Sequence, residues 1–211
     1  MCCAPRLLLG TVGVLVWLIG PTMPIPGGPG GAPVAAPSTI TLHGADPGWI
    51  AGIEADMSAF VRAGLGAPVV DVHVWDRDRT EQCRGYAGLF APTGDRLRVD
   101  LCVDFHDTDL GANLRHKLVL HELAHAWVHA NVDDPTRKAF MNLRGAEAWN
   151  DPEISHYARG TELAANVVMN LLHPEGPSNE QHGCGYELLT GQPVPTGRHD
   201  PCPVWSRREV T

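Results

Sequence analysis

The feature that most constrains this chain is a run from Ala112 to Val132 that contains neither glycine nor proline. It is long enough for about five helical turns, and it carries His121, Glu122 and His125 in the pattern H-E-x-x-H. On a helix, residues four positions apart share one face, so both imidazoles can reach one ion. Glu122 is rotated about 100° around the axis from His121, which places its carboxylate beside that ion. The spacing therefore predicts a helix that holds a metal ion and a water-activating carboxylate.

The neighbours of this motif predict that the helix is buried. They are Leu118, Val119, Leu120, Leu123, Trp127 and Val128. Two imidazoles and a carboxylate are costly to bury without a partner. Zn²⁺, which binds imidazole nitrogen at about 2.0–2.1 Å, is a partner that suits them, although several divalent ions satisfy the same donors. The alternative is a buried helix in which two histidines happen to be four residues apart.

The N-terminal part of the chain has the composition of an export leader followed by a linker. Arg6 precedes an apolar stretch, Leu7 to Gly20, that has the length of a signal peptide and is short for a membrane span. Residues 21–37 are rich in proline, glycine and alanine, which is typical of a disordered linker. We therefore expect a secreted protein with one domain over residues 38–211. An uncleaved membrane anchor through residues 7–20 is the alternative.

Four cysteines lie beyond the leader, and an even number fits an oxidising compartment. Three pairings are possible, and closure of the shorter loops favours Cys83–Cys102 and Cys184–Cys202. A metal site built from cysteines is the alternative, but the sequence has no C-x-x-C spacing. We expect the second disulfide to pin a C-terminal tail, rich in glycine and proline, to the domain.

Periodicity in the rest of the chain predicts an α+β fold. We expect strands at 39–42, 69–75, 86–90 and 97–103, and helices at 48–63, 112–132, 136–143, 161–172 and 187–190. A hairpin turn is expected at residues 92–95. His73 follows the alternation of its strand, which places it on the sheet surface and not at a metal. The expected fold is a small mixed or antiparallel sheet packed on the H-E-x-x-H helix and on a later helix.

A catalytic zinc site needs a third protein ligand, because zinc hydrolases use three side chains and leave the fourth position to water. His129 is too distant, since eight residues rise about 12 Å along a helix. The metzincin motif, H-E-x-x-H-x-x-G-x-x-H, is excluded, because Val128 and Asn131 stand at its glycine and final histidine. The third ligand must therefore come from another part of the chain.

The segment Gly160–Asn166, with the sequence G-T-E-L-A-A-N, follows the H-E-x-x-H motif. Together they resemble the gluzincins, thermolysin-like zinc peptidases in which a later helix carries E-x-x-A or E-x-x-x-D. The resemblance implies that Glu162 binds zinc and that Ala165 allows two helices to pack closely. Gluzincins usually carry an acidic residue where this chain has Asn166, whose side-chain oxygen can accept the free N–H of His121.

Glu162 and the third-ligand position also have other interpretations. Glu162 also suits a solvated carboxylate at the start of a helix. His156 is the second candidate for the third ligand, as in zincin-like proteins with a third histidine. The remaining candidates are Asp133, Asp134, Glu153 and His173.

The resemblance implies a zincin-like fold and a secreted zinc metallopeptidase that acts on peptides or proteins. In such an enzyme Glu122 takes a proton from the metal-bound water and passes it to the leaving amine. A second donor stabilises the oxyanion; His156 and Tyr157 are nearest to Glu162 in sequence, and Tyr186 and His182 are alternatives. We expect the strand Arg96 to Asp104 to form the sheet edge to which an extended substrate adds.

Two alternatives to a peptidase remain. One is an exported metal-binding or interaction domain without turnover, which Asn166 favours and the intact Glu122 opposes. The other is hydrolysis of a non-peptide amide. The net charge of −8, without a basic stripe, argues against nucleic acid as a partner. The acidic segment Asp104–Asp109 lacks the spacing of a calcium loop, and helix capping suits its residues better.

Overall fold

The computed structural model describes residues 38–76, 81–83, 85–94, 96–103, 112–173 and 180–194. These residues form an α+β domain with a mixed four-stranded sheet and five α-helices. The strands are β1 (Thr39–His43), β2 (Asp71–Asp76), β3 (Gly88–Thr93) and β4 (Arg96–Val103). The α-helices are α1 (Gly48–Arg62), α2 (Ala112–Asn131), α3 (Asp134–Arg144), α4 (Gly160–Leu172) and α5 (Glu180–Thr190). Two 3-10 turns are η2 (Glu81–Cys83) and η3 (His156–Ala158).

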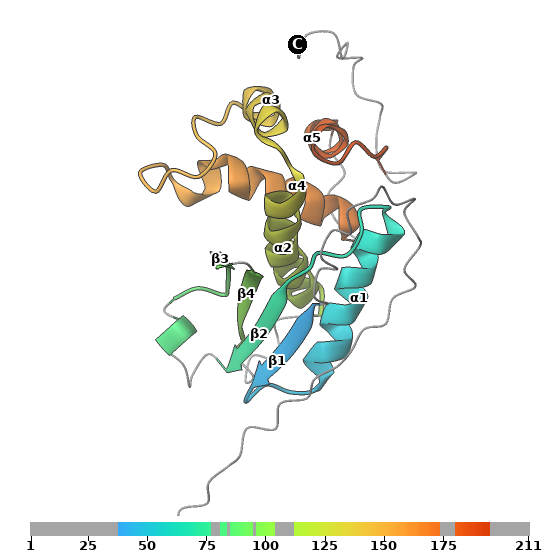
Figure 1. Ribbon diagram of the computed structural model, residues 1–211, viewed down its shortest axis with the longest axis vertical. Coiled ribbons are helices and arrows are strands. Elements are labelled where there is room, and N and C mark those ends of the chain that lie inside the picture. The colour runs from blue at the N-terminus through green and yellow to red at the C-terminus, as the bar shows by residue number, and fades with distance from the viewer. Residues whose placement is uncertain are drawn as a thin grey trace, which may run out of the picture.

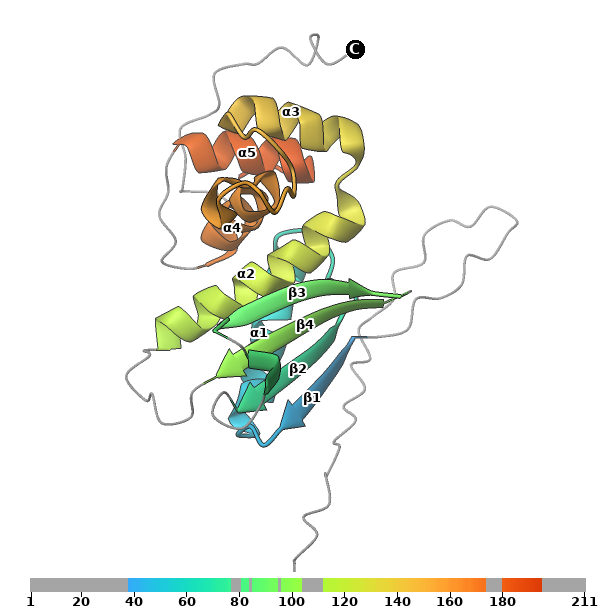
Figure 2. The same cartoon turned by 90° about the vertical axis from the view of Figure 1, so that its left-hand side faces the viewer.

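The sheet has the strand order β1-β2-β4-β3, with β1, β2 and β4 parallel and β3 antiparallel to β4. Helix α1 connects the parallel strands β1 and β2, and α2 follows β4. Both helices contribute to one hydrophobic core with the sheet, and α2 runs alongside β3 (Figure 2). Helices α3, α4 and α5 gather around the C-terminal part of α2 (Figure 1). The predicted strands and helices are therefore present, with shifted ends in several cases.

The predicted turn at residues 92–95 is wrong in its first half. Strand β3 continues through Pro92 and Thr93, which pair with Leu97 and Arg96. Proline is tolerated because β3 is an edge strand, where a missing N–H breaks no ladder bond. Gly94, with φ of 62°, then begins the link to β4.

The expectation that residues 96–104 form the sheet edge is also wrong. Strand β4 lies inside the sheet between β2 and β3, and β3 is the edge next to α2. The hairpin places β3 outside β4, because β4 already uses its other edge to pair with β2. The sequence predicts the pairing of the two hairpin strands, but their order in the sheet depends on contacts between residues that are distant in sequence.

The last helix is longer than the sequence predicts. It begins at Glu180, whereas only residues 187–190 were expected to be helical. Each glycine destabilises an isolated helix by about 1 kcal/mol, so the sequence pattern does not predict a helix here. Gly185 is needed for packing: a Cβ there would lie 3.1 Å from the Phe140 ring and 3.3 Å from Val167. Tertiary contact with α3 and α4 therefore outweighs the low local propensity.

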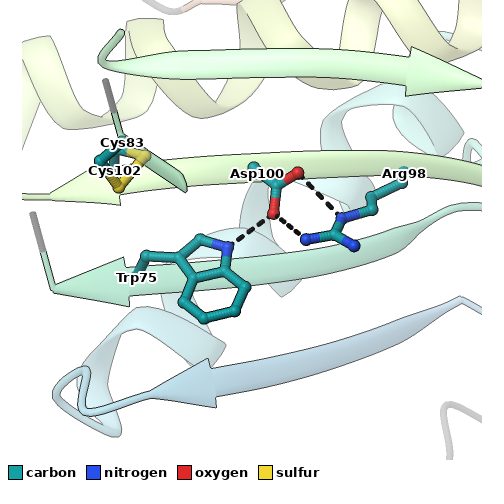
Figure 3. Close-up of a disulfide and its surroundings, with 5 residues drawn as sticks. All are labelled: Trp75, Cys83, Arg98, Asp100 and Cys102. Atoms are coloured by element: carbon teal, nitrogen blue, oxygen red, sulfur yellow. Dashed lines mark hydrogen bonds and ion pairs between the residues drawn. A yellow bond between two sulfur atoms is a disulfide. The ribbon is translucent and has the colours of Figure 1, made fainter. Parts of the chain in front are cut away.

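The predicted disulfide between Cys83 and Cys102 is present and ties η2 to β4 (Figure 3). Closing a loop of 19 residues in this way contributes about 3 kcal/mol in the chain-entropy description. Cys184 is also disulfide-bonded. Its predicted partner, Cys202, lies outside the described residues, as do the leader, the linker and the segment Asp104–Asp109. No helix in the described ranges is long and apolar enough to cross a membrane.

A buried carboxyl joins α1 to α2 and makes the stability of the domain depend on pH. Oδ1 of Asp56 lies 3.0 Å from Nδ1 of His116, and burial raises the pKa of Asp56 to about 6. The folded state therefore binds this proton more tightly than the unfolded chain, whose Asp pKa is about 3.9. Asp56 thus contributes stability below about pH 4 that is lost as the pH rises through about 6.

Asp56→Asn should remove the loss of stability that accompanies ionisation of Asp56 as the pH rises. We expect the variant to be more stable than the wild type at pH 7.5, by up to about 3 kcal/mol for a shift of about two pKa units. The advantage should shrink as the pH falls towards 4. Thermal unfolding of both proteins between pH 4 and pH 8 measures it, and a stability difference that stays constant over this range would show that Asp56 does not titrate as described.

Candidate metal centre

Two packed helices bring three potential ligands together. His121 and His125 project from one face of α2, and Glu162 projects from the first turn of α4. Nε2 of His125 lies 3.1 Å from Nε2 of His121. Oε2 of Glu162 lies 3.2 Å from Nε2 of His121 and 3.3 Å from Nε2 of His125. Among the described residues, these are the side chains whose donor atoms converge as a possible metal site.

The separations between these three donors fit a tetrahedral metal ion. Bonds of about 2.0–2.1 Å to zinc at tetrahedral angles place neighbouring ligand atoms about 3.3 Å apart. The observed separations are 3.1, 3.2 and 3.3 Å. The three side chains can therefore hold a divalent ion, and they account for three of the four positions of a tetrahedral site.

The close approach of α2 and α4 follows from small residues on α4. Ala164 and Ala165 are fully buried, and Glu162 is 7% exposed. The alanine at position 165, one helical turn after Glu162, is the small residue that the E-x-x-A pattern requires there. The local sequence of α4 thus places the carboxylate within reach of both histidines.

The surroundings keep Glu162 ionised and His125 neutral, as metal ligands must be, whereas they favour the proton on His121. Although burial alone would raise it, hydrogen bonds with His121 and His125 hold the pKa of Glu162 well below its usual range. Burial lowers the pKa of His125. Burial also acts to lower the pKa of His121, but the hydrogen bond to Glu162 and the nearby Glu122 raise it overall. Asn166 hydrogen-bonds to His121, as predicted.

His156 lies beside the three converging side chains. Its Nε2 is 3.3 Å from Oε2 of Glu162, on a side chain that is 55% exposed. Tyr157 is 80% exposed, and its ring meets that of His156 edge-on at 5.2 Å. Tyr186 is fully buried in the core on α5, which does not suit a group that must contact substrate. The side chain of His182 lies outside the described residues.

The other sequence candidates stand away from this cluster. Asp133 caps α3 by accepting from the N–H of Thr136, and Asp134 pairs with Arg137. Glu153 is exposed, His173 is buried at the end of α4, and His129 is exposed. His73 stacks with His43 on the outer sheet face, as its strand position predicted. None of these side chains joins the converging group in the described part of the chain.

Glu122 lies against the edge strand β3. It is 6% exposed, and burial raises its pKa to about 7, although the neighbouring His121 acts in the opposite direction. The backbone N–H of Phe90 donates a hydrogen bond to its carboxylate. The Phe90 ring also stacks parallel to the His125 ring at 6.1 Å. The Glu122 carboxylate and the His125 ring are therefore both in contact with β3.

Sequence reasoning missed this role of β3. The contact between Gly88, Phe90 and Glu122 joins segments far apart in the chain, and no local pattern predicts it. One signal was available: a glycine inside a strand often marks a place where another group approaches closely.

Comparison of the chain with protein families, curated proteins and solved structures finds no match. Function must therefore be inferred from the chemistry of the site.

Proposed function

We propose that the protein is a secreted, zincin-like zinc metallopeptidase of the gluzincin type. The observation that carries the proposal is the convergence of His121, His125 and Glu162 with Glu122 beside them. Structural zinc sites are closed by four protein ligands, whereas catalytic sites use three. A site with three converging ligands and an adjacent buried carboxylate favours hydrolysis over a purely structural role.

The side chains around the site have separate tasks in this proposal. A zinc ion held there would lower the pKa of a bound water and polarise a substrate carbonyl. Glu122 accepts the proton of the attacking water and delivers it to the leaving amine. The N–H of Phe90 fixes the orientation of the Glu122 carboxylate, and Asn166 orients His121. His156 is exposed and adjacent to Glu162, which suits a donor to the developing oxyanion.

Peptides and proteins are the substrates that we propose. The outer edge of β3 runs past Glu122, and an extended chain can add to this edge by donating main-chain N–H groups to the outward carbonyls of Gly88 and Phe90. The disulfide between Cys83 and Cys102 supports a secreted protein, since such bonds persist in oxidising compartments. Tyr157 is close enough to His156 to share the substrate side of the site.

An exported metal-binding domain without turnover is the second candidate function. Asn166 favours it, because its hydrogen bond to His121 is a weaker one than a carboxylate would form and leaves His121 less basic than a carboxylate at position 166 would.

Hydrolysis of a peptide mixture separates the two functions. The full chain, loaded with one equivalent of zinc, is incubated with a synthetic library of random peptides, and new termini are identified by mass spectrometry. We expect cleavage that stops with 1,10-phenanthroline and returns when zinc is added back. A protein that binds one zinc per chain but cleaves no peptide would favour the binding domain.

A further inference from the structure

The strand that borders the site carries a glycine at the point of closest approach to the base. Gly88 opens β3 and faces the side chain of Glu122. A Cβ built on residue 88 would lie 2.6 Å from Cγ and 2.7 Å from Cδ of Glu122, and still closer to Oε1. Real Cβ atoms do not approach other atoms this closely, so Glu122 occupies the space that any other residue at 88 would fill.

The register of β3 explains why Glu122 lies there. The C=O of Ala87 accepts from the N–H of Cys102, so odd-numbered residues of β3 bond to β4. In an antiparallel pair the intervening residues direct their backbone groups to the other side. The N–H of Phe90 therefore points off the free edge, where the Glu122 carboxylate accepts it. Pro92, the next residue of the same parity, has no N–H to leave unpaired.

We propose that Gly88 is a positioning residue for Glu122. Its missing Cβ lets the carboxylate lie flat against β3, reach the N–H of Phe90 and remain beside the His121–His125–Glu162 cluster. The catalytic meaning of this contact rests on the proposed function, but the contact itself does not.

Two other glycines with close neighbours, Gly160 and Gly185, have a different role. A Cβ at Gly160 would meet the Trp149 ring at 2.7 Å and its Cα at 3.2 Å, and one at Gly185 would meet the core residues Phe140 and Val167. Those two glycines permit packing of the fold. At Gly88 the atoms in the way belong to one flexible side chain that can swing aside. Alanine at 88 should therefore leave the fold intact and displace the carboxylate by about 1 Å, a shift large enough to cost about 100-fold in rate.

The test compares Gly88→Ala with Gly52→Ala, whose added Cβ would meet nothing within 4 Å. The full zinc-loaded chain is measured in three ways: zinc per chain by native mass spectrometry, exchange of the Phe90 amide by NMR, and hydrolysis of the random peptide library. For Gly88→Ala we expect unchanged zinc, Phe90 exchange at least tenfold faster, and hydrolysis reduced about 100-fold. Gly52→Ala should match the wild type in all three.

Three results would overturn the proposal: a Gly88→Ala protein that keeps Phe90 protected, one that keeps full hydrolysis, or one that cannot fold. Glu122→Ala supplies a second check, because it should expose the Phe90 amide. Adding Gly88→Ala to that variant should then change neither Phe90 exchange nor the melting temperature. If the wild type cleaves nothing, the peptidase proposal fails, while the amide exchange still decides the role of Gly88.

Discussion

Glu162→Ala should remove stoichiometric metal binding from the protein. Oε2 of Glu162 is the atom shared by both histidines, at 3.2 and 3.3 Å, so its loss leaves only two donors. Changes to residues that merely support ligands weaken metal binding by about 10–100-fold, and loss of a ligand itself should cost more than 100-fold. Competition with a chromophoric zinc chelator, followed by native mass spectrometry, measures this affinity.

Two further variants make that result specific. Glu153→Ala removes an exposed carboxylate elsewhere in the same region and should leave zinc affinity unchanged. His156→Ala should also keep the ion, because His156 contacts Glu162 without joining the converging group. If His156→Ala lost the ion and Glu162→Ala retained it, the third ligand would be His156.

Glu122→Gln should abolish hydrolysis while zinc remains bound. Glutamine keeps the shape of the side chain and can still accept from the N–H of Phe90, but it cannot take a proton from water. Loss of a general base costs about 10²- to 10⁴-fold in rate. Turnover of any peptide that the wild type cleaves, together with zinc per chain on the same samples, gives both quantities.

The control for that variant is Glu153→Gln, which makes the same chemical change at an exposed position. It should hydrolyse the peptide at the wild-type rate. A Glu122→Gln protein that retained more than about a tenth of wild-type turnover would exclude Glu122 as the base.

Much of the candidate metal centre could be predicted because its parts are local. The positions of His121 and His125 on one helical face follow from periodicity alone, and α2 has the predicted extent to within a residue. Glu162 was reached through the resemblance to gluzincins, since no local pattern links α4 to α2. The geometry agrees with that choice, because Ala165 is fully buried where the helices meet.

The parts that escaped prediction depend on contacts between distant segments. The order of β3 and β4 in the sheet could not be read from a hairpin pattern, which fits either strand at the edge. Helix α5 was underestimated because the weak helix propensity of Gly185 is offset by packing on Phe140 and Val167. The contact of Glu122 with β3 could not be predicted for the same reason, since it joins a helix to an edge strand that is distant in sequence.

Anomalous X-ray diffraction at the zinc edge, on crystals of the zinc-loaded protein, tests the central claim most directly. We expect one strong peak between α2 and α4, at about 2.0–2.2 Å from Nε2 of His121, Nε2 of His125 and an oxygen of Glu162, with no fourth protein ligand. A zinc-loaded crystal without a peak there, or with the ion enclosed by four protein side chains, would contradict a catalytic metal centre in this protein.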